Sequence, residues 1–212
     1  MIISGGTLYE ELIEKTIGSA RSPALSGWTK GWSSCIATGS SPAISWEILT
    51  VCPRRSWTII KTRPTSPCVS SIRSRTPPDT EIAVRLAITL GCHEMVILGA
   101  TGSRVDHLWA NIQTLTIPFK AGIDAVILDP MNRIRLIGGE THLKKEDAFG
   151  DYFSVFPLEI PVDDFNIRGA KYPLKNHILK PYDSLCVSNE YKEDTVEIEF
   201  SFGIVILMET KD

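Results

Sequence analysis

Residues able to handle phosphate are concentrated between Gly99 and His107, where the chain reads GATGSRVDH. Backbone N–H groups of a glycine-containing turn can hold phosphate oxygens when the turn opens a helix, because the helix N-terminus attracts negative charge. Arg104 can bind phosphate oxygens directly. The carboxylate of Asp106 would instead repel a phosphate unless a metal ion or a hydrogen-bond donor lies between them. This combination favours a metal-assisted site for the phosphates of a nucleotide.

Two other interpretations of this turn stay open. Glycine-containing turns between a strand and a helix are common, so this one could be a tight turn without a ligand. It could also be the dinucleotide fingerprint of an NAD-type oxidoreductase, although Val105 stands where that fingerprint has its third glycine. We therefore favour a nucleotide phosphate site with a metal ion over NAD binding.

A further acidic residue, Asp79, begins the sequence Asp79-Thr80-Glu81 at the start of an expected helix. Its side chain can cap the helix, and a capping carboxylate can also bind Mg²⁺. A magnesium site that uses phosphates plus one or two carboxylates needs acids clustered at strand ends. Capping and metal binding are both open for Asp79 on this reasoning.

The elements that position these residues alternate regularly outside residues 20–78. Strands are expected at 1–4, 95–98 and 125–128, and helices at 8–17, 79–90 and 106–117. Ile82, Leu86 and Leu90 share one face of the second helix, which should stop at Gly91, and Pro118 should end the third. Strands alternating with helices predict a parallel sheet that binds ligands at the carboxyl ends of its strands.

The helical period disappears from about Arg133 onward. Short alternating runs such as 152–156, 196–200 and 204–208 are separated by Gly, Pro, Asn and Asp, which predicts a small β-sandwich. We therefore divide the chain into an α/β nucleotide-binding domain over 1–130 and an all-β domain over 131–212. The sequences KYPL at 171–174 and VSNE at 187–190 are the notable clusters of the second domain, and a plain polar turn is the alternative for the latter.

Composition excludes several classes of protein. The chain has 212 residues, 43% apolar and 22% charged, which is typical of a globular protein. Its longest apolar stretch, 203–208, is too short to span a membrane, and the first six residues lack the features of a secretory signal, so we expect a cytoplasmic protein without membrane contact. Five cysteines without a CxxC pair indicate reduced thiols. The net charge of -3 gives no reason to expect nucleic acid as a partner.

Residues 20–78 differ in composition from the rest of the chain. They contain four of the five tryptophans and eight basic side chains, but only one acid, Glu47. A disordered basic insert and a tryptophan-rich binding loop are two interpretations of this segment. A third, which we favour, is that the segment was translated in the wrong reading frame.

Tryptophan tests the frame hypothesis because it has a single codon, TGG. If the segment is read one base earlier, Trp28 and Trp57, each followed by threonine, must both yield aspartate. Trp46 followed by Glu47 must yield glycine, and the codons after it allow the motif GDFDS. The shifted frame thus predicts the acidic residues that a magnesium site at Asp79 would need.

Taken together, these motifs resemble the thiamine pyrophosphokinase family. The resemblance covers IISGG near the N-terminus, DTE with its helix, VILGATGSRVDH, KYPL and VSNE, in the family's order and spacing. It implies an α/β domain joined to a β domain and a homodimer with active sites at its interface. It also implies a transferase that moves pyrophosphate from MgATP to the hydroxyl of thiamine and releases AMP.

The resemblance also implies roles for individual residues. Asp79 is similar to a magnesium ligand, and Asp106 to an acid near the metal and the phosphates. Arg104 would neutralise charge on the transferring group, and Gly102 would let the backbone of the turn between Gly99 and His107 approach ATP. Ser188 and Asn189 would help to hold thiamine. Ser103 departs from a commoner glycine, and the chain as it stands lacks the family's GDFDS acids.

We expect a polypeptide with residues 20–78 as they stand to have little or no activity, because several carboxylates are missing. A catalytically dead relative that binds nucleotide, or merely dimerises, is the alternative if that segment is genuine. An NAD-type oxidoreductase is the other alternative.

Overall fold

The computed structural model describes residues 2–4, 9–19 and 78–212, so the frame prediction for 20–78 lies outside the described residues except for Pro78. The helices are α1 (Glu10–Ser19), α3 (Asp79–Thr89), α4 (Val105–Thr114) and α5 (Thr116–Lys120), with a short 3-10 helix at Lys145–Asp147. The strands of the first half are β1 (Ile2–Ile3), β2 (Glu94–Leu98), β3 (Asp124–Leu128), β4 (Asn132–Ile137) and β5 (Thr141–Lys144). The others are β6 (Tyr152–Pro157), β7 (Val162–Arg168), β8 (Leu174–Leu179), β9 (Asn189–Glu190), β10 (Thr195–Glu199) and β11 (Val205–Thr210). None of the helices in these ranges is long and apolar enough to cross a bilayer.

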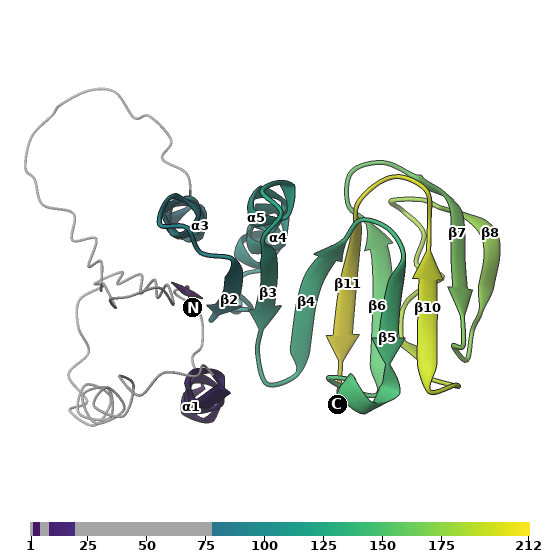
Figure 1. The fold of residues 1–212 in the computed structure, drawn as a ribbon, viewed down its shortest axis with the longest axis horizontal. Helices are drawn as coiled ribbons and strands as arrows, with labels where there is room; N and C mark the ends of the chain where they lie inside the picture. The colour runs from purple at the N-terminus through teal and green to yellow at the C-terminus, as the bar shows by residue number, and fades with distance from the viewer. Residues whose placement is uncertain (1, 5–8, 20–77) are drawn as a thin grey trace, which may run out of the picture.

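Two sheets organise the described chain (Figure 1). The larger has seven strands in the order β1-β2-β3-β4-β11-β6-β9, and the smaller has the order β5-β10-β7-β8. The β1, β2 and β3 strands run parallel, whereas every other neighbouring pair is antiparallel. The expected α/β unit followed by a β-sandwich is therefore confirmed, and its sheet is mixed, since only three of the seven strands form the parallel part.

One row of backbone pairing crosses the large sheet from the α/β unit to its far edge. Leu98 at the end of β2 pairs with Leu128 on β3, which pairs with Arg133 on β4. The row continues through Glu209 and Phe153 to Asn189 on β9. The carboxyl ends of the parallel strands and residue 189 thus lie at the same end of the sheet.

Each face of the large sheet is buried against a different layer, because neighbouring side chains of a strand point to opposite faces. Ile97, Ile127 and Ile206 pack with apolar residues of α3, α4 and α5. Val205 and Leu207 instead belong to the core between the two sheets. The smaller sheet thus forms a sandwich with the β4, β6 and β11 part of the larger one.

Helix α3 turns a different face to the core than the apolar pattern suggests. Ile82 and Leu90 are 37% and 44% exposed, while the buried residues are Thr80, Ala83, Val84 and Ala87. Small side chains let the helix axis approach the strands closely, which explains why this face packs inward. Asp79 is also not the cap, because Pro78 holds that position and Asp79 is the first helical residue. Gly91 follows the C-cap with a φ of 76°, as expected for a residue that ends a helix.

Pro118 does not end the third helix, contrary to expectation. The helix α4 ends at Thr114 and a second short helix, α5, begins at Thr116 and includes Pro118. A proline in the first turn of a helix removes an N–H that has no partner within the helix, so it is tolerated there. The third helix therefore ends before Leu115, and not at Pro118 as the sequence predicted.

The turn between β3 and β4 lies at the expected boundary between residues 130 and 131. Asp129 accepts hydrogen bonds from the backbone N–H groups of Met131 and Asn132, both at 2.7 Å. The large sheet continues across this turn, because β3 and β4 are paired. The division into domains at this point stays a prediction.

Candidate active site

The turn between β2 and α4 contains a glycine in a left-handed conformation and leads directly into the start of a helix. Gly99 has a φ of 67°, a left-handed conformation that a side chain disfavours. Arg104 is the N-cap of α4, so the N–H groups of the first helical turn, which have no acceptor within the helix, follow it directly. The buried amide of Asn111 donates a hydrogen bond to the carbonyl of Ala100 at 2.9 Å and so fixes the turn to α4. No role was predicted for Asn111 from the sequence.

Arg104 and Asp106 form a two-point ion pair at the amino end of α4. Arg104 donates from Nε to Oδ1 of Asp106 at 3.1 Å and from Nη2 to Oδ2 at 2.6 Å. The backbone N–H of His107 also donates to Oδ1, at 2.9 Å. The hydrogen bond from Arg104 is the main cause that lowers the pKa of the Asp106 carboxyl, and the same contact raises the pKa of Arg104. Both side chains are exposed, so a ligand can reach either of them.

Asp79 lies at the same end of the sheet as this turn. Thr80, the next residue, shares a hydrogen bond between its Oγ1 and Oγ of Ser4 at 2.9 Å. The backbone N–H of Ser4 donates to the carbonyl of Leu98 at 2.7 Å. These contacts join the start of α3 to the carboxyl ends of β1 and β2, and Asp79 itself is exposed there.

Two of the carboxylates that were predicted to lie near a magnesium ion are among the described residues. Carboxylate oxygens such as those of Asp79 and Asp106 suit Mg²⁺. No group of three or more His, Cys, Asp or Glu residues within the described ranges is placed to hold a metal ion. Asp106 in addition has both oxygens engaged by Arg104. The carboxylates therefore fit the ion chemically, but the set is incomplete within the described part of the chain.

The KYPL and VSNE clusters are brought together at the far edge of the large sheet. Asn189 is 2% exposed, and its side chain contacts the backbone of Tyr172 twice. Ser188 is exposed, has a φ of 54°, and donates its backbone N–H to Oγ of Ser154 at 2.9 Å. Lys171 pairs with Glu190 at 2.5 Å. Of the two predicted thiamine residues, Ser188 thus lies on the surface and Asn189 is buried beneath it, and Ser154 is a partner that the sequence did not indicate.

The phosphate turn and the Ser188–Asn189 surface do not meet within one chain. Four strands separate β2 from β9 in the large sheet. Neighbouring strands lie about 4.8 Å apart, so five steps correspond to about 24 Å. The two clusters share one end of the sheet but are too far apart for a single small molecule to contact both.

A buried ion-pair cluster stands between them. Glu209 is 1% exposed and accepts two hydrogen bonds from Arg133, at 2.7 Å to Oε2 and 2.5 Å to Oε1. Tyr191 donates its hydroxyl to Oε1 at 3.2 Å, and its burial, with the nearby carboxylate, raises the pKa of that hydroxyl. Arg135 lies 3.9 Å from Oε2. The cluster borders a hollow of about 580 Å³, and no sequence pattern singled it out.

These features define a class: an α/β unit with a phosphate-type turn at the carboxyl ends of its parallel strands, joined to a β-sandwich. Family comparison agrees with this description in both halves. Residues 63–127 match the family described as thiamin pyrophosphokinase, catalytic domain. Residues 140–205 match the thiamin pyrophosphokinase, vitamin B1 binding domain. The chain belongs to the thiamine pyrophosphokinase family.

Individual relatives give the same result. The chain is 30% identical over 135 residues to the thiamine pyrophosphokinase of Bacillus subtilis, covering 63% of each protein. The crystal structure of the Bacillus subtilis enzyme has a TM-score of 0.60 at 29% identity, covering 64% of this chain and 63% of that one. The crystal structure of the thiamin pyrophosphokinase from Geobacillus thermodenitrificans has a TM-score of 0.58 at 31% identity, covering 66% of this chain and 64% of that one. The chain thus spans less than two thirds of the length of these relatives, and none of these comparisons supports an NAD-type oxidoreductase.

Proposed function

We propose that this protein transfers pyrophosphate from ATP to the hydroxyl of thiamine and releases AMP. The observation that carries the proposal is the turn from Gly99 to Asp106, which presents helix N–H groups and an arginine in a chain that matches both family domains. In the reaction, the thiamine oxygen forms a bond to the β-phosphorus of ATP. The bond from that phosphorus to the oxygen of the leaving AMP breaks, and the hydroxyl proton is released.

Arg104 and Asp106 have complementary roles in this proposal. Phosphate oxygens of ATP compete with Asp106 for the guanidinium of Arg104, because both are oxyanions that bind the same fork of N–H groups. Once Arg104 turns to the phosphates, the carboxylate of Asp106 is available to accept the proton of the thiamine hydroxyl. The remaining contribution is positioning, which matters more than covalent chemistry in phosphoryl-type transfer.

Asp79 is the proposed magnesium ligand of the described part of the chain. Its support is its place at the carboxyl ends of β1 and β2 and its exposed carboxylate. When bound, Mg²⁺ neutralises charge on the phosphates of ATP. The other carboxylates are expected from the shifted reading of 20–78.

A homodimer with the active site at its interface explains the separation of the two clusters. About 24 Å of sheet lies between the phosphate turn and Ser188 in one chain. In a two-fold dimer, a contact between residue i of one chain and residue j of the other is repeated as j with i, so the thiamine cluster of each chain can cover the phosphate turn of its partner. We propose this arrangement and a cytoplasmic location together with the activity.

A catalytically dead relative is the second candidate. It is favoured by the single acid within residues 20–78 and by the incomplete metal set of the described residues. The intact mass of the protein from its native source separates the two, because a chain read in the shifted frame differs in mass from the chain as it stands.

Calorimetry with three ligands tests the proposal without turnover. The native protein should bind thiamine and an ATP analogue whose α,β-bridging oxygen is replaced by methylene, and it should not bind NAD. Binding of NAD would contradict the proposed function. So would a protein that binds the ATP analogue but does not bind thiamine.

A further inference from the structure

We propose that Ser154 and Asn189 are positioning residues that hold Ser188 and Tyr172 in the arrangement that binds thiamine. This inference rests on the proposed function. It differs from the role that the resemblance implies for Asn189, because it assigns contact with thiamine to Ser188 and Tyr172 instead. It also adds Ser154, a residue of β6, to the thiamine site.

The side-chain amide of Asn189 is used within the protein. Its oxygen accepts from the backbone N–H groups of Tyr172 and Glu190, at 3.0 and 2.9 Å. Its nitrogen donates to the carbonyl of Tyr172 at 2.8 Å. An amide side chain offers two donor hydrogens and two acceptor sites, so three of the four are occupied. Contact with a ligand would have to displace these bonds, whereas holding the backbone of Tyr172 uses them as they are.

Ser154 fixes the neighbouring residue in an unfavourable backbone conformation. Ser188 has a φ of 54°, in the left-handed region that residues with a side chain seldom adopt. Its N–H donates to Oγ of the buried Ser154, and the next strand residue, Val155, donates its N–H to the carbonyl of Cys186 at 3.2 Å. Strand β6 therefore anchors the turn at two consecutive positions. Backbone strain that the surrounding contacts maintain is typical of functional sites.

The groups that these anchors leave exposed suit a flat organic cation. Tyr172 is 56% exposed, and the adjacent Ser188 and Val187 are exposed as well. Nζ of Lys171 lies 5.5 Å from the centroid of the Tyr172 ring and pairs with Glu190, so the ring and the carboxylate already accommodate a positive charge. Thiamine carries a positively charged thiazolium ring, which would take the place of the Lys171 ammonium on this surface.

Calorimetric titration of the full chain tests the inference with two ligands. Ser154→Ala and Asn189→Ala should each weaken thiamine binding about tenfold, since the first loses one and the second three of the hydrogen bonds that order the surface. Binding of the methylene ATP analogue should stay within about twofold of the parent, because the hydrogen bonds of Ser154 and Asn189 are made to residues 172, 188 and 190 and not to the phosphate turn. Ser154→Thr retains the hydroxyl and should recover most of the affinity for thiamine.

Asn111→Ala is the matched control. Asn111 is also a buried amide that holds a backbone carbonyl, but its partner is Ala100 in the phosphate turn. This variant should weaken binding of the ATP analogue and leave binding of thiamine unchanged. That is the reverse of the result expected for Asn189→Ala. Equal losses for both ligands in all three variants would indicate general destabilisation and would overturn the inference.

Amide hydrogen exchange gives a readout that needs no ligand. In Ser154→Ala, exchange should accelerate at Val187, Ser188 and Asn189 and stay unchanged in α4. Parent-like exchange and parent-like thiamine affinity in this variant would overturn the inference while leaving the proposed function intact. A parent protein that binds the ATP analogue but not thiamine would instead refute the proposed function and this inference with it.

Discussion

Arg104 and Asp106 are paired with each other, because both oxygens of the Asp106 carboxylate accept hydrogen bonds from the Arg104 guanidinium, at 3.1 and 2.6 Å. Arg104 is proposed to bind the phosphates of ATP, and Asp106 is proposed to accept the proton of the thiamine hydroxyl. The ion pair must therefore open when ATP binds. The pair is exposed, and exposed ion pairs are weak, which makes opening easy.

Arg104→Gln removes this contact and the proposed phosphate ligand together. The pKa of the Asp106 carboxyl should rise towards its ordinary value, because the hydrogen bond from Arg104 is the main cause of its depression. Catalytic rate in the native protein should fall by about 10² to 10³, as for loss of a group that stabilises transition-state charge. NMR titration of the carboxyl and steady-state kinetics measure the two effects.

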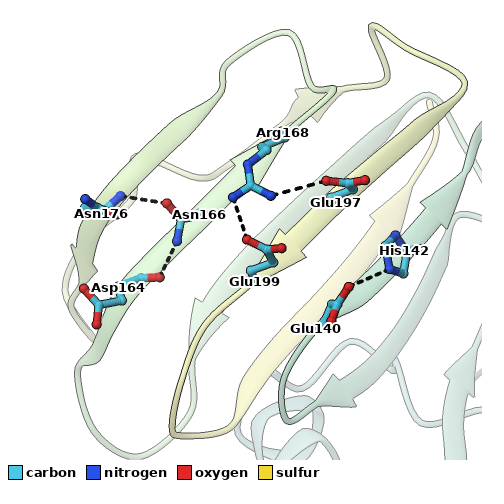
Figure 2. A network of polar contacts seen from close by, with 8 residues as sticks. All are labelled: Glu140, His142, Asp164, Asn166, Arg168, Asn176, Glu197 and Glu199. Atoms are coloured by element: carbon cyan, nitrogen blue, oxygen red, sulfur yellow. Dashed lines mark hydrogen bonds and ion pairs between the residues drawn. The ribbon is translucent and has the colours of Figure 1, made fainter.

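Arg168→Gln is the control for Arg104→Gln. Arg168 is also an exposed arginine, but it bridges Glu197 and Glu199 on the smaller sheet, at 3.4 and 2.8 Å (Figure 2). The control should leave the rate unchanged. A loss in Arg168→Gln equal to that in Arg104→Gln would contradict a specific role for Arg104.

Glu209→Gln should destabilise the fold strongly. The substitution leaves Arg133 without its buried counter-charge and also takes the nearby carboxylate from Arg135. Removing one partner of a buried ion pair costs about 3 to 5 kcal/mol. Urea unfolding measures the loss, and Glu159→Gln is a control, because the pair of Glu159 with Lys120 is exposed and should change stability by less than about 1 kcal/mol. Equal effects of the two variants would refute the structural role of Glu209.

Acidification should loosen the turn that follows β8. The hydrogen bond from His177 is the first cause that lowers the pKa of Asp183, and the backbone N–H of Leu185 is the second. A carboxyl whose pKa is lowered in the folded state stabilises that state fully above its ordinary pKa of about 3.9, and the contribution disappears as pH falls through the lower folded value. The protection factor of the Leu185 amide, which is the exchange rate of an unfolded amide divided by that of Leu185 at the same pH, should therefore fall below about pH 4. Asp183→Asn should remove this pH dependence, and its persistence in the variant would contradict the assignment.

The thiol of Cys186 should resist alkylation in the native state. Burial, with a smaller effect of Asp183, raises its pKa to about 12, so almost no thiolate exists at pH 8. Mass spectrometry of the peptide that contains Cys186 should show slow modification by iodoacetamide before unfolding and rapid modification in urea. Rapid modification of the native protein would show that the turn around Cys186 opens readily.

Mixing two inactive variants tests the proposed interface. Arg104→Gln damages the phosphate turn and Ser188→Ala the thiamine surface, so each homodimer has two damaged sites. If each site combines the two surfaces from different chains, a mixed dimer has one intact site, and an equal mixture should recover about a quarter of the parental activity. No recovery after verified subunit exchange would indicate that each site lies within one chain.

Local sequence patterns predicted the parts of this fold that depend on neighbouring residues. The strand before Gly99, the helix after Arg104 and the stop at Gly91 are all present, because periodicity, turns and caps are local properties. The face of α3 was not predictable in this way. Its buried residues are small, and close packing of a helix on a sheet outweighed the larger residues Ile82 and Leu90.

The residues of the candidate site that belong to one motif were predictable from the sequence, whereas contacts between distant residues were not. The motif singled out both Arg104 and Asp106, but it did not predict the ion pair between them. Asn111, Ser154 and the partners of Glu209 act across strands or between a helix and a turn, and a single sequence contains no signal for such pairs. The separation of about 24 Å between the two clusters depends on the order of the strands in the sheet, which the sequence does not contain.

The most direct test of the account is product analysis by phosphorus NMR of native protein incubated with ATP, thiamine and magnesium. We expect AMP and thiamine diphosphate in equal amounts, with no AMP when thiamine is omitted. A polypeptide made with residues 20–78 as they stand should be slower by about 10² or more, because it lacks carboxylates of the metal site. Formation of ADP, or release of AMP without thiamine, would contradict the proposed transfer, and full activity of that polypeptide would contradict the shifted reading frame.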